Sequence, residues 1–284
     1  MTILQILILA IIQGACELLP VSSSAHVIMA EKVMGLDPTA PDMTFLLVML
    51  HTGTMAAVIV YFWRGWRLRY FSSRAAFWRF AKLVTLATAL TGVIGLALML
   101  LLERVVLGGA VHPEVELLFG NPYLIAAGLG TVGVMIILSG MREAVSRGHD
   151  ALGLAGAAWI GAVQGLCLPF RGFSRSGATI STGLFLGLDK QRVEEFSFAL
   201  VVVLTPAVIL KEGYRLLKAQ QGALADPGSF FQLAWPSLLG MIFSFIAGLV
   251  ALRWLSRWLE NGRWHWFGYY CMVAALVVIG IGTR

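Results

Sequence analysis

The chain has 284 residues, of which 58% are hydrophobic and only 13% are charged, and its formal net charge is +6. Soluble domains carry about a quarter charged residues, and a β-barrel needs short alternating segments that this sequence lacks, so both classes are excluded. The composition predicts an all-α polytopic membrane protein with a single transmembrane domain over residues 1–284.

The N-terminal segment has the apolar run of a signal peptide and ends at a cysteine, in "MTILQILILAIIQGAC". No Lys or Arg precedes Lys32, so the basic region that begins such signals is missing. We therefore expect these residues to remain in the folded protein. Cys16, Cys167 and Cys271 form no CxxC pair, and we expect them to be small buried hydrophobic residues.

Six apolar runs are long enough, or nearly so, to cross a bilayer as helices: 43–63, 83–102, 122–141, 196–211, 234–252 and 266–283. The segment 63–80 interleaves Arg with Trp, Tyr and Phe directly after the first of these runs. This pattern is typical of a membrane interface on its positive side. It indicates membrane lipids as partners and argues against a nucleic acid.

Two segments of the chain resemble each other: "QGACELLPVSSSAHVIMAEKVMGLD" (13–37) and "QGLCLPFRGFSRSGATISTGLFLGLD" (164–189). In both, a break rich in Pro, Ser and Gly separates two apolar arms that are short for full spans, which predicts a re-entrant helical hairpin. Three full spans follow each hairpin. Because a hairpin does not cross the membrane and three spans do, the halves, about 1–141 and 151–284, are expected to be two inverted-topology repeats.

This arrangement divides the loops into two sets. One set holds thirteen Lys and Arg residues: 64–82, 142–150, 189–195 and 253–265. The other set holds four: 35–42, 103–121 and 211–233. The positive-inside rule places the first set in the cytoplasm and both termini outside. The same counts support the orientation of the halves more firmly than they support re-entrance.

Hydroxyl residues open the second arm of each hairpin, at Ser22 and Ser174. Such residues cap the orphan N–H groups of a helix start, and those N–H groups can also hold an anion. If the hairpins enter from opposite faces, their tips meet near the midplane. Arg175 has no acidic residue within ten positions and is predicted to bind an anion such as phosphate there. The alternative is a structural ion pair with Glu17, and the two interpretations agree if the anion carries a metal between them.

Gln13 and Glu17 lie one helical turn apart on the same face of the first arm. An amide oxygen and a carboxylate at this spacing can hold a hard divalent cation, Mg²⁺ or alternatively Ca²⁺, against phosphate oxygens. The spacing alone is weak support, because any amphipathic helix supplies such pairs.

His26 lies one helical turn from Ser22 and close to Ser23. A histidine and a serine within this reach suit a nucleophile and a proton-transfer group. The alternative is a packed histidine that is bonded to a backbone carbonyl. His51, in "MLHTGTMAAV", is expected to be a packing residue where small residues let two helices approach.

The motifs "QGACELLPVSSSAH" and "RGFSRSGATIS" closely resemble the two signatures of the bacterial undecaprenyl-diphosphate phosphatase family, the integral-membrane type associated with bacitracin resistance. The likeness extends over most of the chain, including "EEFSF" at 194–198. It implies the inverted-repeat fold and a site that opens to the periplasmic side of the bacterial inner (plasma) membrane. The activity that it implies is removal of one phosphate from a C55 polyprenyl diphosphate lipid, which recycles the carrier for peptidoglycan synthesis.

The resemblance also assigns site residues. Its (E/Q)xxxE motif falls on Gln13 and Glu17, the implied metal ligands, and its serine–histidine stretch falls on Ser22, Ser23 and His26. Its PGxSRSxxT motif falls on Gly172, Ser174, Arg175, Ser176 and Thr179, which would bind the substrate together with Ser22. Two departures stand out: Gln13 leaves a single carboxylate, and Arg171 replaces the proline and could itself reach phosphate.

The resemblance implies catalytic roles for Glu17, Ser23, His26 and Arg175. The terminal phosphorus could be attacked by His26, by Ser23 activated by His26, or by water activated by His26 or Glu17, and the sequence does not choose. A transporter or flippase for an anionic polyprenyl phosphate lipid is the competing class, because inverted repeats with broken helices are typical of carriers. A structural membrane subunit is a weaker alternative, and a homo-oligomer remains open.

Overall fold

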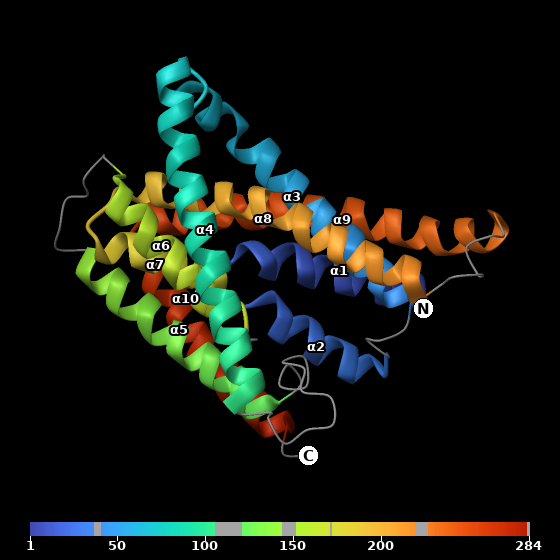
Figure 1. Cartoon of the computed structure of the whole chain (residues 1–284). Helices are drawn as coiled ribbons and strands as arrows, with labels where there is room; N and C mark the ends of the chain where they lie inside the picture. The colour runs from blue at the N-terminus through green and yellow to red at the C-terminus, as the bar shows by residue number, and fades with distance from the viewer. Residues whose placement is uncertain (37–40, 106–120, 144–151, 171, 220–226, 283–284) are drawn as a thin grey trace.

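The computed structural model describes residues 1–36, 41–105, 121–143, 152–170, 172–219 and 227–282, and the secondary structure there is helical. In each half of the chain, two short helices precede three longer ones (Figure 1). The helices of the first half are α1 (Ile3–Leu18), α2 (Ser23–Met34), α3 (Pro41–Arg69), α4 (Arg74–Val105) and α5 (Pro122–Glu143). Those of the second half are α6 (Leu154–Cys167), α7 (Arg175–Phe185), α8 (Lys190–Ala219), α9 (Pro227–Glu260) and α10 (Trp264–Gly282).

Five of these helices are long and apolar enough, within the described residues, to cross a membrane. The candidate spans are Phe45–Arg69, Arg74–Val105, Pro122–Arg142, Trp235–Glu260 and Trp264–Ile281. They coincide with five of the six apolar runs predicted from the sequence, and the sixth, 196–211, is helical as part of α8. The chain is therefore an all-α, multi-pass membrane protein, as its composition predicts.

The long helices pair across the two halves of the chain. Helix α3 packs against α9 and α8, and α5 runs beside α10 (Figure 1). The short helices occupy related places, because α1 packs on α9 while α6 packs on α4. Each half thus holds the first short helix of the other half against its own fourth helix.

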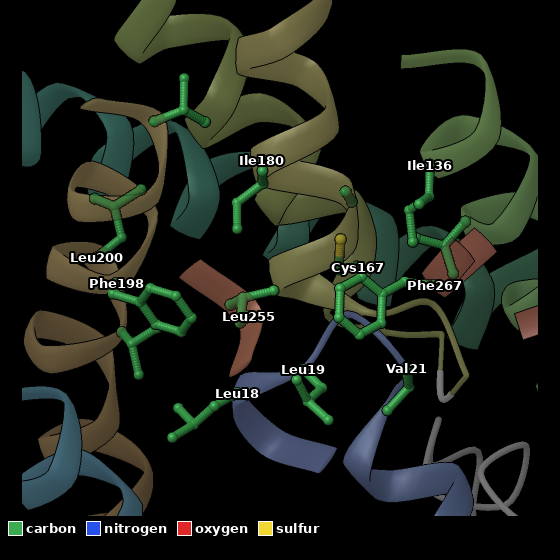
Figure 2. Packing of buried hydrophobic residues seen from close by; sticks show 14 of the residues in the cluster. Leu18, Leu19, Val21, Ile136, Cys167, Ile180, Phe198, Leu200, Leu255 and Phe267 are labelled. Atoms are coloured by element: carbon green, nitrogen blue, oxygen red, sulfur yellow. The ribbon is translucent and has the colours of Figure 1, made fainter. Parts of the chain in front are cut away.

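The connection between α1 and α2 lies inside the apolar core. Leu19 and Val21 are buried beside Leu18, in one cluster with side chains from α7, α8 and α10 (Figure 2). Burial of these apolar residues fixes the position of a connection that would otherwise be a mobile turn. All three cysteines are free thiols; Cys167 and Cys271 are buried, as predicted, whereas Cys16 is half-buried.

The two helix breaks have special backbone conformations. Ser22, just before α2, has a φ of 65°, which is the only positive φ of a non-glycine residue in the described part of the chain. Such a conformation costs about 1–3 kcal/mol and persists only where the surroundings enforce it. Before α7, Gly172 has a φ of 93°, and Ser174 caps the helix with its hydroxyl oxygen, which accepts a hydrogen bond from the Gly177 N–H. Both short helices therefore start at a serine, as the motifs predict.

Two glycines with positive φ provide a matched stability test of the second break. At Gly35 the φ is 63° and an added Cβ would meet no atom within 4 Å, whereas at Gly172 it would overlap the carbonyl of Ile125. Gly35→Ala is expected to lower the free energy of unfolding by about 1 kcal/mol, the cost of the backbone conformation alone. Gly172→Ala adds a steric clash and is expected to cost about 3 kcal/mol. Thermal unfolding in detergent micelles measures both, and equal losses would show that the contact with Ile125 is not close.

Candidate active site

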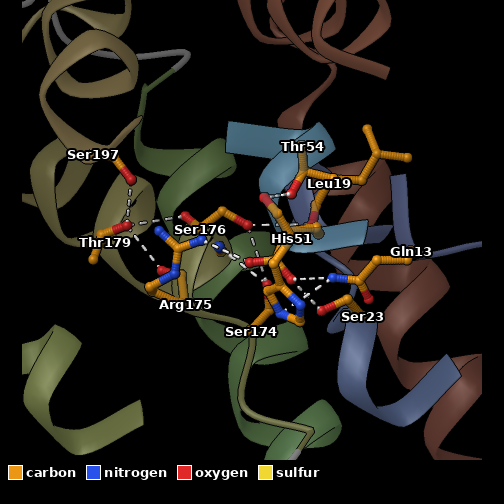
Figure 3. Close-up of polar contacts among 12 residues, drawn as sticks. Gln13, Leu19, Ser23, His51, Thr54, Ser174, Arg175, Ser176, Thr179 and Ser197 are labelled. Atoms are coloured by element: carbon orange, nitrogen blue, oxygen red, sulfur yellow. Dashed lines mark hydrogen bonds and ion pairs between the residues drawn. The ribbon is translucent and has the colours of Figure 1, made fainter. Parts of the chain in front are cut away.

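The tips of the two helix breaks meet. The Ser176 hydroxyl, at the start of α7, donates to the carbonyl oxygen of Leu19 in the α1–α2 connection, at 3.2 Å. The guanidinium Nη2 of Arg175 lies 3.2 Å from Oε1 of Glu17, near the end of α1 (Figure 3). The two motifs lie far apart in the chain, and their contact here is the one predicted from the sequence.

Glu17 is the centre of the polar cluster that results. Its Oε1 pairs with Arg175, and its Oε2 accepts hydrogen bonds from the Ser23 hydroxyl at 2.6 Å and from the Gln13 amide nitrogen at 3.2 Å. The Glu17 side chain is only 16% exposed and that of Arg175 19%. A carboxylate this enclosed is stabilised by its three donors, since a buried charge without partners would be very costly.

The orientation of the Gln13 amide follows from its partners. Its nitrogen donates to Glu17 and lies 3.3 Å from Nε2 of His51 in α3. Nδ1 of His51 faces the carbonyl oxygen of Leu47 at 2.8 Å, so Nδ1 carries the proton and Nε2 accepts the second Gln13 N–H. The reverse orientation would turn the amide oxygen toward a carboxylate, which is repulsive. Gln13 therefore links the Glu17 carboxylate to His51 in α3.

Arg175 has an unused donor. Nη2 pairs with Glu17, but the buried Nη1 has no hydrogen-bond partner. Buried polar groups are nearly always bonded in folded proteins, so an unpaired guanidinium nitrogen indicates a place for an acceptor. The two interpretations of Arg175 from the sequence thus hold together, because one nitrogen makes the ion pair and another is available for an anion.

The remaining predicted substrate-binding residues of α7 lie deeper. Thr179 is fully buried, donates to the Arg175 carbonyl oxygen at 2.8 Å and lies 2.6 Å from the Ser197 hydroxyl in α8. Ser174 and Ser176 are also buried, and their hydroxyls lie 3.3 Å apart. The hydrogen bonds of these side chains hold the start of α7, which carries Arg175, in position. Gly172 is buried in the connection, and Arg171 lies outside the described residues.

His26 is not joined to Ser23 in this arrangement. The single hydroxyl proton of Ser23 is directed at Glu17, so the base beside Ser23 is the carboxylate. His26 instead lies with Nδ1 2.8 Å from the Ser22 carbonyl oxygen and Nε2 2.6 Å from the Tyr270 hydroxyl. The contact with a backbone carbonyl, predicted as the structural alternative for His26, is present, and the second nitrogen is hydrogen-bonded to Tyr270.

As arranged, these residues do not fit a resident divalent cation. The described residues contain no group of three or more His, Cys, Asp and Glu side chains that could hold a metal. The one carboxylate, Glu17, is already bonded to three donors, and Gln13 presents its nitrogen rather than its oxygen. Mg²⁺ binds through one or two carboxylates together with substrate phosphates. Glu17 and Gln13 would have to give up their present hydrogen bonds before they could bind such a cation.

Sequence reasoning missed two neighbours of the site, His51 and Tyr270. Ionisable side chains inside membrane spans are functional by default, and this rule would have drawn attention to His51. The expected packing at a small residue does occur beside it, because a Cβ on Gly53 would overlap the Met241 backbone of α9. Tyr270 stands in "WHWFGYYC", which is typical of an aromatic membrane interface, and no local signal distinguishes it.

Comparisons with known proteins agree along the whole chain. Residues 6–277 match the family described as bacitracin resistance protein BacA. The chain is 59% identical to undecaprenyl-diphosphatase 2 of Acinetobacter baylyi over 280 residues, which cover 98% of each protein. It is 33% identical to the undecaprenyl-diphosphatase of Rhodopirellula baltica over 99% of both, and 33% identical to that of Thermus thermophilus over 96% of this chain and 95% of the relative. The similarity thus covers both helix breaks and the long helices that follow them.

Proposed function

The chain belongs to the bacitracin resistance protein BacA family, and from this membership we propose that it hydrolyses undecaprenyl diphosphate to undecaprenyl phosphate and inorganic phosphate. The reaction is that of a membrane phosphatase that recycles the lipid carrier for cell-wall synthesis. The substrate and the membrane lipids around the apolar helices are its partners.

One observation carries the proposal. A half-buried guanidinium with one unpaired nitrogen stands beside a carboxylate that holds a serine hydroxyl at 2.6 Å. Arg175 and the N–H groups at the start of α7 can neutralise a terminal phosphate, since guanidinium groups and helix N-termini both favour phosphate oxygens. Stabilising the charge in this way is the main requirement of phosphoryl transfer.

The geometry favours Ser23 as the nucleophile and Glu17 as its base. The Ser23 oxygen bonds to the terminal phosphorus, the bond from that phosphorus to the bridging oxygen breaks, and the hydroxyl proton passes to Glu17. Undecaprenyl phosphate leaves, water cleaves the phosphoserine, and Ser23 regains a proton as inorganic phosphate departs. His26 is the second candidate, as a phosphohistidine or as the base for water, because its Nε2 carries a lone pair.

A divalent cation enters the proposal only as a companion of the diphosphate. Glu17 and Gln13 are the residues proposed to meet it, and Gln13 would have to turn its amide oxygen toward the ion. No step is assigned to the cation. Phosphate release that is unaffected by a chelator, and is increased by neither added Mg²⁺ nor added Ca²⁺, would remove it from the proposal.

The activity is tested with the purified chain in liposomes that contain undecaprenyl diphosphate. We expect stoichiometric release of inorganic phosphate and accumulation of undecaprenyl phosphate. A transporter or flippase would instead move labelled lipid between leaflets without releasing phosphate. Lipid movement alone would overturn the phosphatase assignment.

We also propose the inverted-repeat arrangement, with re-entrant hairpins formed by α1–α2 and α6–α7. Equivalent glycines in the two copies of the repeat support it. A Cβ on Gly14 in α1 would lie 2.5 Å from the Ser244 carbonyl oxygen in α9, and a Cβ on Gly165 in α6 would lie 3.0 Å from the Thr91 carbonyl oxygen in α4. Helices α4 and α9 are each the fourth helix of their half, so both glycines make the same contact with the opposite half.

The orientation in the bacterial plasma membrane is proposed from the distribution of positive charge. The basic loops lie in the cytoplasm, both termini lie outside, and the site opens to the periplasm. A short epitope tag at either terminus is therefore expected to bind antibody on intact spheroplasts. Tags that become accessible only after the membrane is permeabilised would reverse the orientation.

A further inference from the structure

The two ring nitrogens of His26 have different partners. Nδ1 faces the Ser22 carbonyl oxygen, which can only accept, so in the neutral ring the proton is on Nδ1 and the lone pair is on Nε2. Nε2 is the nitrogen that either candidate role of His26 requires, as a nucleophile or as a base. It lies 2.6 Å from the Tyr270 hydroxyl, which therefore donates to it.

Tyr270 reaches His26 from the other half of the chain. The two rings are stacked, with their centroids 5.7 Å apart and an interplanar angle of 14°. The next residue, Cys271, directs its thiol at the Pro20 carbonyl oxygen in the α1–α2 connection, at 3.3 Å. Tyr270 is thus held beside the strained turn at Ser22 that orients His26 from the opposite side.

Close packing of α10 on α5 fixes the position of Tyr270. A Cβ on Gly268, two residues earlier, would lie 2.6 Å from the Gly133 carbonyl oxygen, so the two backbones are in direct contact. Small residues at such a contact let helices approach without intervening side chains. A tyrosine whose helix is held by direct backbone contact is more rigid than one held by flexible side chains. Such rigidity suits a residue that orients another side chain.

We propose that Tyr270 is the positioning residue of His26: its hydroxyl holds the imidazole with Nε2 as the acceptor and covers that nitrogen until substrate takes its place. The inference rests on the proposed catalytic use of His26. It assigns a function to α10, which supplies none of the motif residues. The hydroxyl that substrate displaces is then free to donate to a phosphate oxygen.

Two neighbouring tyrosines provide the test and its control. Tyr269 and Tyr270 are 47% and 48% exposed on the same helix, but the ring contacts of Tyr269 are with His265 and Trp266. Tyr270→Phe and Tyr269→Phe each remove one hydroxyl and keep the ring. Acylation of His26 by diethyl pyrocarbonate, followed by peptide mass spectrometry, reports how open Nε2 is, and it requires no turnover.

We expect Tyr270→Phe to acylate at His26 at least about three-fold faster than the wild type, because one hydrogen bond to Nε2 is lost. Its kcat for undecaprenyl diphosphate is expected to fall about ten-fold with KM within two-fold, while Tyr269→Phe matches the wild type in every measurement. An acylation rate of Tyr270→Phe equal to that of Tyr269→Phe would overturn the proposal, and so would an unchanged kcat. If the wild type released no phosphate, the proposed function would fail, yet the acylation rates would still decide whether Tyr270 covers Nε2.

Discussion

Replacing Arg175 by Ala is expected to lower kcat/KM for undecaprenyl diphosphate by about a thousand-fold, the effect of losing an arginine that stabilises a phosphoryl-transfer transition state. The reason is that Arg175 has one hydrogen-bond donor without a partner: Nη1 is buried and unpaired, while Nη2 pairs with Glu17. A site largely closed to water strengthens the interaction with phosphate, so its loss cannot be offset by solvent. Initial rates of phosphate release over a range of substrate concentrations measure the effect.

Two further variants separate the loss of phosphate binding from the loss of the ion pair. Arg175→Lys keeps a positive charge beside Glu17 but lacks the planar fork, and it is expected to remain at least about a hundred-fold impaired. Arg64→Ala removes an exposed arginine from the basic end of α3 and is expected to retain near wild-type activity. Full activity in Arg175→Lys would mean that only charge is needed, and activity in Arg175→Ala would remove the proposed phosphate site.

Glu17→Gln is expected to lower kcat by about a thousand-fold, because it keeps the shape of the side chain but cannot take the Ser23 proton or balance Arg175. Removal of one member of a catalytic unit commonly costs 10³-fold or more. The direct readout is phosphate on Ser23, trapped by rapid denaturation in SDS at mildly alkaline pH, where phosphoserine and phosphohistidine both survive, and located by mass spectrometry. We expect it in the wild type and not in Glu17→Gln.

Gln13→Ala is the matched control for this experiment. It removes a donor to Glu17 and the link to His51 but leaves the carboxylate, so turnover is expected to fall only about ten-fold. Trapped phosphate on His26, in the wild type and in Glu17→Gln alike, would overturn the assignment of Ser23 and Glu17. It would make the histidine the nucleophile.

The sequence predicts which residues form the site better than it predicts which of them bond to one another. The hydroxyl-rich starts of α2 and α7 and the isolated Arg175 are local signals, and the structure places them together as expected. Which group the Ser23 hydroxyl bonds to depends on the direction of its side chain, and the spacing of residues in the sequence does not reveal that direction. A serine that directly follows Ser22 and lies three residues before His26 could face either the imidazole or Glu17, and the strained φ of Ser22 directs it to Glu17.

The repeat in the sequence indicates a shared scaffold but not shared chemistry. In the alignment of the two copies, the places of Glu17 and His26 are taken by Leu168 and Ala178, and the place of Arg175 is taken by Ser23. The first copy therefore supplies the carboxylate and the imidazole, and the second copy supplies the guanidinium. Partners from the long helices, such as His51 and Tyr270, have no counterpart in the repeat motif, which is why sequence reasoning did not find them.

The ion pair between Glu17 and Arg175 joins positions that are 158 residues apart. During synthesis α1 and α2 are made before the segment that carries Arg175. The Glu17 carboxylate therefore gains its guanidinium partner only after the chain has been synthesised as far as α7.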